Sequence, residues 1–165
     1  MRKVRKEVTE ILQWLVKKIE QNLILNSLVL FGSYARGEER PESDLDILII
    51  SEDFPRRFSE RFDVLRPFFK EAKLHPAYIR LRKKGFYLQF SPIPYKPEEL
   101  KRTPPLLLDL VEDGIIIKDD GTFSKKISEL KKRLKELGAK RLVTSKGNKY
   151  WALKPKIRKG EVIEI

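Results

Sequence analysis

The first half of the chain alternates between apolar spacings that indicate a helix and apolar runs that indicate strands. Apolar side chains recur every three or four positions over residues 4–23, which predicts an amphipathic helix with one core-facing stripe. Apolar runs over 27–31 and 47–50 predict buried strands, and the second is apolar throughout, so we expect it to be central in a sheet. Residues 33–43 predict a loop, where Pro41 disfavours a helix.

The middle of the chain predicts a second helix followed by two further strands. Residues 56–73 again show helical spacing of apolar side chains. Polar and apolar residues alternate over 78–82, which predicts a strand. Residues 86–91 predict another strand after a turn. We expect it to end at a sheet edge, because Pro92 and Pro94 lack the N–H groups that a central strand donates.

The rest of the chain predicts shorter elements and one long helix. Helices are predicted over 97–102, from Pro104-Pro105 to the residue before Gly114, and over 123–137, where Gly138 ends the helix. Strands are predicted over 115–117, 141–144, 150–153 and 162–165. The whole pattern predicts an α/β (α+β) fold. A change in composition near residue 120 divides the chain into a main domain over 1–120 and a C-terminal extension over 121–165, made of a basic helix and β-structure.

Composition excludes several kinds of protein. The 165 residues contain no cysteine, which excludes disulfides and thiolate metal sites. No apolar stretch of about 20 residues is present, and the N-terminus lacks the apolar core of a signal peptide. We therefore expect a cytoplasmic protein with no membrane partner. Charged residues form 36% of the chain, a composition typical of thermophile surfaces.

Positive charge is concentrated at the C-terminal end. The formal net charge is +12, and residues 121–165 carry fourteen Lys or Arg against four Glu. Such a surface suits a polyanion, either RNA or DNA. A solvated, highly charged face without a polyanionic partner explains the same pattern equally well. Both interpretations stay open at this point.

The chemistry-bearing residues cluster between the two N-terminal strands. Asp44 and Asp46 are two positions apart at the start of a strand, so both carboxylates point to one face while Leu45 points to the other. Paired carboxylates repel each other unless a cation lies between them, and Mg²⁺ is often held by two carboxylates plus substrate phosphates. Gly32 and Ser33, which end the preceding strand, offer backbone N–H groups and a hydroxyl to those phosphates. The stretch predicts a site for a metal-bound nucleoside triphosphate.

This arrangement resembles a known family. Gly-Ser, ten residues and then Asp-x-Asp, on a strand–turn–strand frame, is similar to the nucleotidyltransferase superfamily of the DNA polymerase β type. The fuller form Gly-Ser-Tyr-Ala-Arg-Gly followed by Ser-Asp-Leu-Asp looks like the minimal nucleotidyltransferases of archaea and bacteria. The resemblance is sharp over residues 28–50 and looser elsewhere. It implies a mixed β-sheet with flanking helices, and a nucleotidyltransferase domain over 1–120.

The resemblance also implies an activity and a role for each matching residue. The expected reaction moves an NMP group, most plausibly AMP from ATP, to a hydroxyl acceptor with the help of Mg²⁺ or Mn²⁺. Asp44 and Asp46 correspond to the catalytic, metal-binding pair. Gly32 and Ser33 correspond to the residues that bind the triphosphate. Arg36 stands where a loop cation would neutralise phosphate charge, although a solvated loop position is an equal alternative.

One feature of the family pattern is missing. The family usually has a third carboxylate on a later strand, but residues 72–97 contain no acidic residue, and Gln89 stands where the acid is expected. An amide oxygen brings neither negative charge nor a base. Two alternatives to an active transferase therefore stay open. One is a catalytically degenerate module that binds nucleotide or RNA, and the other is a regulatory partner of the antitoxin kind, which some minimal nucleotidyltransferases are.

Overall fold

The computed structural model describes residues 4–145, 149–154 and 165. Its helices are α1 (Lys6–Glu20), α2 (Gly32–Arg36), α3 (Phe58–Ala72), α4 (Pro76–Lys83), the 3₁₀ helix η1 (Pro97–Arg102), α5 (Leu106–Asp113) and α6 (Thr122–Leu137). Its strands are β1 (Leu25–Phe31), β2 (Asp44–Ser51), β3 (Gln89–Tyr95), β4 (Ile115–Asp119), β5 (Lys140–Val143) and β6 (Lys149–Ala152). None of the described helices combines the length and the apolar content that a membrane span needs.

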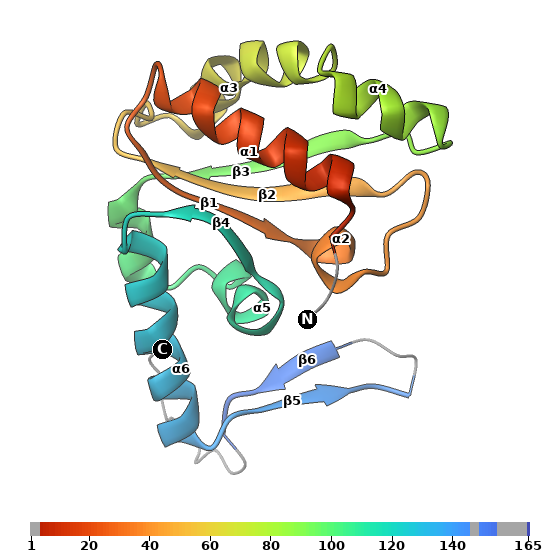
Figure 1. The fold of residues 1–165 in the computed structure, drawn as a ribbon. Helices are drawn as coiled ribbons and strands as arrows, with labels where there is room; N and C mark the ends of the chain where they lie inside the picture. Colours follow the sequence, from red (N-terminus) through yellow and green to blue (C-terminus); the bar gives the residue numbers. More distant parts are fainter. Residues whose placement is uncertain (1–3, 146–148, 155–164) are drawn as a thin grey trace.

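The first four strands form a mixed sheet in the order β3-β2-β1-β4. Strand β1 pairs antiparallel with β2 and with β4, whereas β2 and β3 are parallel. Figure 1 shows α1, α3 and α4 on one face of this sheet and α5 and α6 on the other. Strands β5 and β6 form a separate antiparallel hairpin. The predicted fold class, a mixed sheet with flanking helices, is confirmed.

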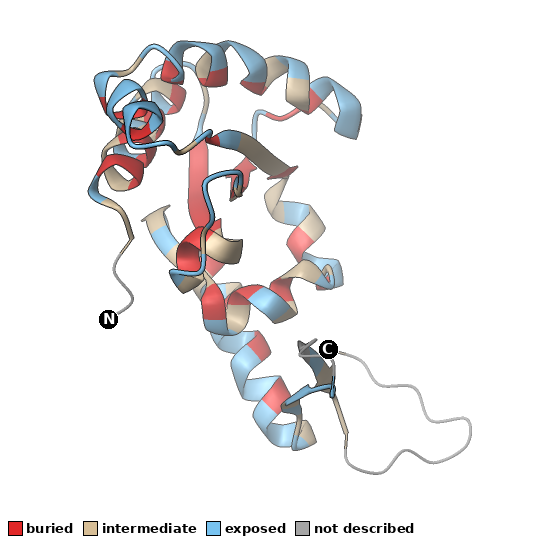
Figure 2. Ribbon diagram, turned by 90° about the vertical axis from the view of Figure 1, so that its right-hand side faces the viewer, coloured by how far each residue is buried: buried red, intermediate tan, exposed pale blue. Residues whose placement is uncertain are grey.

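Alternate residues of the central strands feed two separate cores. On β2, the odd-numbered Leu45 and Ile47 are fully buried against α1, α3 and α4. The even-numbered Leu48 and Ile50 are equally buried, but against α5 and α6. Figure 2 shows buried residues along the sheet and on the inner sides of the helices, with exposed residues on the outer sides. Even-numbered positions of β2 therefore face the α5–α6 side.

Helix α6 ties the last quarter of the chain to the sheet. Its apolar stripe enters the second core through Phe123, Ile127, Leu130 and Leu134. The helix ends before Gly138, as predicted. The hairpin is held to α5 by Trp151, whose Nε1–H donates to the Leu108 carbonyl at 3.1 Å. The domain boundary near residue 120 stays a prediction, and most of the strand predicted over 162–165 lies outside the described residues.

The strand predicted over 78–82 is wrong, because these residues belong to helix α4. Pro76 occupies the first helical turn, and the His75 ring accepts a hydrogen bond at Nδ1 from the Ala77 N–H at 3.2 Å. Leu81, one turn after Ala77, is fully buried on the same helix face. Five alternating positions are too few to separate a strand from one and a half turns of helix when the capping residues lie outside the pattern.

Two other local predictions need correction. The strand predicted over 86–91 lies further along, over Gln89–Tyr95, although it is at a sheet edge as expected. Pro92 and Pro94 lie inside this strand. Because they are two positions apart, their backbone nitrogens point to the same side of the strand. The continuous pairing of β3 with β2 indicates that this side faces away from β2, so the two missing N–H groups do not interrupt the pairing. The loop predicted over 33–43 begins instead as the short helix α2.

Candidate functional site

The candidate site begins at the sharp turn between β1 and α2. Gly32 directly follows β1 with φ at +71°, a left-handed conformation that L side chains rarely adopt. Gly37 closes α2 in the same conformation, with φ at +70°, and its N–H donates to the Ser33 carbonyl. The two glycines confine Ser33 and Arg36 to a single short helix at the end of β1. The sequence therefore turns from strand to helix without an intervening loop.

The carboxylate of Asp46 lies against the backbone of Gly32. A Cβ atom built on Gly32 would be 2.1 Å from Asp46 Oδ2 and 3.0 Å from its Cγ. No real side chain tolerates such a separation, so position 32 requires glycine for space as well as for conformation. The register of β1 and β2 explains the closeness, because Phe31 pairs directly with Asp46. The turn and the acidic strand are thus parts of one local structure.

Asp44 and Asp46 lie on the same face of β2. Both are even-numbered positions, so they face the α5–α6 side, whereas Leu45 between them is fully buried in the other core. Asp44 is exposed and Asp46 is half-buried. Burial of Leu45 fixes the register of the strand, and with it the direction of both carboxylates.

The environment of Asp46 disfavours its negative charge. Burial raises the pKa of the Asp46 carboxyl, and the neighbouring charge of Asp44 raises it further. A hydrogen bond with the Ser91 side chain and the positive charge of Arg36 oppose this shift without cancelling it. An added cation beside the pair would reverse the effect, since opposite charge favours the ionised carboxylate. The electrostatics therefore favour a cation at this position.

Arg36 lies between the candidate site and the end of helix α5. Its Nε–H donates to Glu38 at 2.7 Å, and its Nη1 is 3.8 Å from Oδ2 of Asp113. The Asp113 side chain is only 5% exposed, whereas Arg36 retains 28% exposure. Arg36 is thus partly accessible, and it also acts electrostatically on Asp46. This position suits a cation that meets phosphate.

The position of the missing third carboxylate is occupied by neutral polar residues. In the parallel register of β2 and β3, Gln89 pairs with Asp44 and Ser91 pairs with Asp46. Gln89 is exposed, and the Ser91 side chain hydrogen-bonds Asp46. Sequence reasoning identified Gln89 but missed Ser91 and Asp113. Ser91 lies two positions after Gln89 on the same strand, so both side chains face the same side of the sheet, and this spacing could have identified Ser91. No local pattern in the sequence indicated Asp113.

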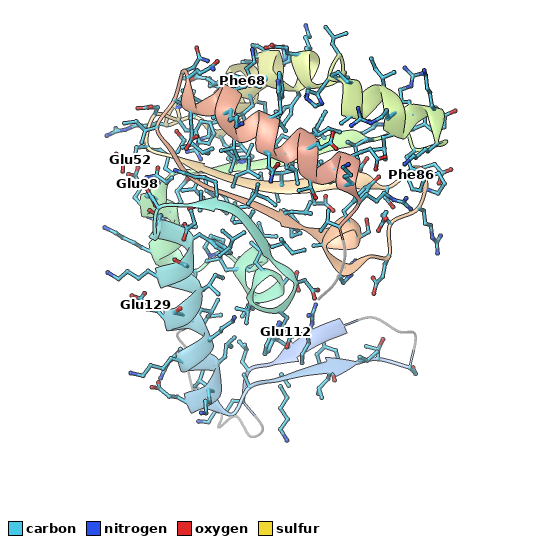
Figure 3. All side chains as sticks on the ribbon, in the orientation of Figure 1. Glu52, Phe68, Phe86, Glu98, Glu112 and Glu129 are labelled. Atoms are coloured by element: carbon cyan, nitrogen blue, oxygen red, sulfur yellow. The ribbon has the colours of Figure 1, made fainter. Side chains whose placement is uncertain are left out.

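Four other acidic side chains, those of Glu52 and Asp53 after β2 and of Asp63 and Glu71 on α3, make contacts away from the site. Glu52 and Asp53 follow the far end of β2, about 25 Å from Asp44 at the rise of a strand. Figure 3 shows Glu52 at the end of the sheet opposite Phe86, which precedes β3. Glu52 accepts a hydrogen bond from the Asn26 side chain, and Asp53 accepts one from the Ile24 N–H. On α3, Asp63 pairs with Arg66 and Glu71 pairs with Lys18.

Comparison with known proteins identifies the family. Residues 5–137 match the family described as the nucleotidyltransferase domain. The chain belongs to this family. A Methanocaldococcus jannaschii protein whose name proposes protein adenylyltransferase activity is 33% identical over 134 residues, covering 78% of this chain and 83% of the relative. A second protein from the same organism, with the same proposed activity, is 43% identical over 47 residues, covering 28% of this chain and 55% of the relative.

Solved structures of similar fold are more distant from this nucleotidyltransferase. A Sulfolobus solfataricus protein, provisionally described as a nucleotidyltransferase, has a TM-score of 0.45 and 16% identity, covering 73% of this chain and 93% of its own. A toxin–antitoxin structure with AMP-PNP has a TM-score of 0.42 and 18% identity, covering 81% and 94%. Both likenesses are too weak to add to the family assignment, which rests on the sequence matches and confirms the predicted enzyme class.

The donor set of this nucleotidyltransferase fits a divalent cation only in combination with substrate. Among residues 4–145, 149–154 and 165, no group of three or more His, Cys, Asp or Glu could hold a metal ion. Asp44 and Asp46 supply two hard oxygen donors, and Mg²⁺ in phosphate-binding sites commonly takes its other ligands from water and phosphate. The raised pKa of Asp46 agrees with such a fit. The roles of the individual residues stay predictions.

Proposed function

We propose that this nucleotidyltransferase transfers AMP from ATP to a hydroxyl acceptor, with Mg²⁺ or Mn²⁺ held by Asp44 and Asp46. The observation that carries the proposal is the contact between the Asp46 carboxylate and the backbone of Gly32. It brings the candidate cation ligand to the turn that would bind the phosphates. Family membership supports nucleotidyl transfer at a coarse level, whereas the nucleotide, acceptor and metal belong to the proposal.

The residues of the site have separate tasks in this reaction. Ser33 and the backbone of Gly32 bind the phosphate tail, and Arg36 offsets part of its charge. Asp44 and Asp46 would hold a divalent cation, which would supply positive charge to offset that of the departing pyrophosphate. The acceptor oxygen bonds to the α-phosphorus, the bond from that phosphorus to pyrophosphate breaks, and the proton of the acceptor hydroxyl passes to solvent water. Positioning and charge neutralisation supply most of the acceleration in such transfers.

The names of the relatives support a protein acceptor. Both Methanocaldococcus jannaschii proteins carry names that propose adenylyl transfer to protein. The first of them is matched over most of its length. A Ser, Thr or Tyr hydroxyl of a protein is therefore the acceptor class to test first.

A second candidate function is nucleotide binding without turnover. The observation that favours it is the pair of neutral residues, Gln89 and Ser91, opposite the two carboxylates. Neither side chain can accept the acceptor's proton as a carboxylate would. In this case Mg²⁺-dependent ATP binding would persist, but no AMP would be transferred.

The first experiment measures binding. Isothermal titration calorimetry with ATP, with and without Mg²⁺, should show affinity that depends on the cation. Asp44→Asn and Asp46→Asn should each abolish the Mg²⁺-dependent part. Asp63→Asn is the matched control, since this exposed carboxylate on α3 pairs with Arg66 away from the site. Equal ATP affinity in all four proteins contradicts the proposed site.

The second experiment measures transfer. ATP labelled at the α-phosphate is incubated with Mg²⁺ or Mn²⁺ and with three acceptors: the chain itself, a protein extract and total RNA. We expect label on protein that disappears with Asp46→Asn and remains with Asp63→Asn. Binding without label on any acceptor favours the second candidate function. Label on RNA would keep the enzyme class but replace the proposed acceptor.

Three other expectations stay predictions. The two interpretations of the basic residues over 121–165 predict different results: binding of RNA or DNA with an affinity that falls steeply with salt favours a polyanionic partner, and flat affinity across salt favours a solvated face. Copurification of a protein partner with the chain would support the alternative of a regulatory partner of the antitoxin kind. A cytoplasmic location is expected from composition alone.

A further inference from the structure

Helices α3 and α4 belong to a stretch of the chain with a large excess of positive charge. Glu71 is the only acidic residue from 64 to 97, whereas the same stretch contains eight Lys or Arg. Glu71 itself pairs with Lys18 of α1 at 2.6 Å. Figure 1 shows α3 and α4 on the outside of the fold, at the end opposite the β5–β6 hairpin. The stretch therefore has no carboxylate left to neutralise its own cations.

The cations of α4 divide into a paired and an unpaired set. On the flank next to α1, Arg80 and Lys84 form ion pairs with two glutamates of that helix. On the other flank, the side chains of Arg82 and Lys83 form no ion pair or hydrogen bond with any described residue. The same holds for Lys73, which directly follows α3, and all three are exposed. Because like charges repel one another, an anionic partner would stabilise this unpaired set.

The unpaired cations line a hollow that also has an apolar wall. Lys73, Ile79, Arg82 and Lys83 enclose about 340 Å³, and we call this site the α3–α4 hollow. The three α4 residues are at positions i, i+3 and i+4, so they share one face of the helix. Ile79 is 45% exposed, and Leu74, next to Lys73, is 75% exposed. The hollow thus combines an aliphatic wall with a cationic rim.

Ile79 is not needed to hold α4 on the sheet. The opposite side of the helix enters the first core through Ala77, Tyr78 and Leu81. A single exposed aliphatic side chain is common on protein surfaces and indicates nothing by itself. Its position among three unpaired cations is what distinguishes this site, because an occupant can bury Ile79 and neutralise the rim together.

The lining of the α3–α4 hollow fits a protein segment better than a nucleic acid. Single strands are usually held by aromatic side chains that stack on bases, and none of the four lining residues is aromatic. Duplexes are held through their phosphates, which would leave Ile79 without an apolar contact. Protein interfaces, in contrast, typically have an apolar centre and a polar rim. The lining therefore favours a protein segment that has both carboxylates and an aliphatic side chain.

We propose that the α3–α4 hollow docks an acidic segment of a partner protein, with an aliphatic side chain against Ile79 and carboxylates against the three cations. The hollow lies on the α1 side of the sheet, whereas the candidate nucleotide site faces the α5–α6 side. The proposal therefore does not depend on the function proposed above.

The test uses the full chain and a synthetic helical peptide in which glutamates flank a stripe of leucines. Titration calorimetry should show binding that weakens as salt rises, because salt screens exposed charges. The same peptide with serine in place of leucine should bind at least about fivefold more weakly. Equal affinities for the two peptides, or no binding of the leucine peptide, would overturn the proposal.

Charge reversal at the rim tests the electrostatic part. Arg82→Glu/Lys83→Glu should weaken binding of the leucine peptide by about tenfold or more, since like charges would then face each other. The matched control is Lys131→Glu/Lys132→Glu, which makes the same charge change at two adjacent exposed positions of α6. It should change affinity by no more than about twofold. Equal losses in both variants would mean that only net charge attracts the peptide, and the proposal would be wrong.

A variant of the wall tests the apolar part. Ile79→Ser should fold, because the side chain is nearly half exposed. It should weaken the leucine peptide by about fivefold and change affinity for the serine peptide by no more than about twofold. Unchanged affinity for the leucine peptide contradicts the proposed contact.

Two further measurements keep the result decisive. If the charge-reversed variant does not fold, Arg82→Gln/Lys83→Gln should weaken the leucine peptide by about threefold relative to Lys131→Gln/Lys132→Gln, and equal affinities would overturn the proposal. Single-stranded RNA of the same net charge tests the other occupant. RNA that binds more tightly than the leucine peptide, and loses affinity only with the rim variant, would replace the proposed protein segment by nucleic acid.

Discussion

Substitution of Gly32 by alanine isolates the contact on which the proposed function depends. Alanine at φ +71° is destabilised by about 1–2 kcal/mol relative to glycine. In a chain of this size, that loss lowers the melting temperature by about 2–8 °C. The new Cβ would also lie 2.1 Å from Asp46 Oδ2, so the carboxylate must retreat by about 1 Å to reach an allowed separation. A displacement of this size in a catalytic group can reduce rates by about 100-fold.

Gly37→Ala provides a control with the same backbone conformation and no clash. Its φ is +70°, and apart from its chain neighbours no atom of the described residues lies within 4 Å of a Cβ built there. Both variants should therefore melt at lower temperatures in differential scanning calorimetry, Gly32→Ala by at least as much as Gly37→Ala. Only Gly32→Ala should lose Mg²⁺–ATP affinity, by about tenfold or more in titration calorimetry. Wild-type affinity in Gly32→Ala, or an equal loss in Gly37→Ala, would refute the reasoning.

Three other substitutions test the electrostatics of the structure. Asp46→Asn should raise the melting temperature at neutral pH, because burial raises the pKa of this carboxyl and its charged form opposes folding; a lower melting temperature contradicts this. In the wild type, Mg²⁺–ATP affinity should fall as the pH drops through that raised pKa, as titration calorimetry across pH would measure. Burial raises the pKa of the Asp119 carboxyl, but hydrogen bonds, first from Ser124, lower it more, so the net shift is downward. The contribution of Asp119 to stability is therefore complete above the ordinary carboxyl pKa. It is lost as the pH falls through the lowered pKa. Asp119→Asn should then destabilise the protein by about 1–2 kcal/mol at pH 7 and flatten the acid side of its stability profile in urea titrations. Arg61 is 2% exposed, donates to Glu99 at 2.6 Å and donates to three backbone carbonyls. Arg61→Ala should therefore lower the free energy of unfolding, measured in urea, by about 3 kcal/mol or more. A loss below about 1 kcal/mol would contradict these bonds.

The sequence-based predictions were correct where the residues of one segment decide its structure, and wrong where residues outside the segment decide it. The long helix over 4–23 and the apolar run over 47–50 were predicted because their burial shows in the period of the pattern. The segment over 78–82 was mistaken for a strand because His75 and Pro76, which start helix α4, lie outside the alternating residues. The start of β3 was misplaced because its pairing with β2, rather than its own apolar residues, decides where the strand begins.

The local parts of the site follow from the amino-acid sequence alone. Glycine at position 32 sets the turn, and the two-residue spacing of Asp44 and Asp46 puts both carboxylates on one face of a strand, since these features depend on backbone conformation and strand period. The hydrogen bond of Ser91 with Asp46 and the place of Asp113 between two arginines, Arg36 and Arg141, come from the packing of the folded chain. Those contacts join residues tens of positions apart. Pairing of β2 with β3 brings Ser91 to Asp46, and packing of α5 against α2 and the hairpin brings Asp113 to its arginines.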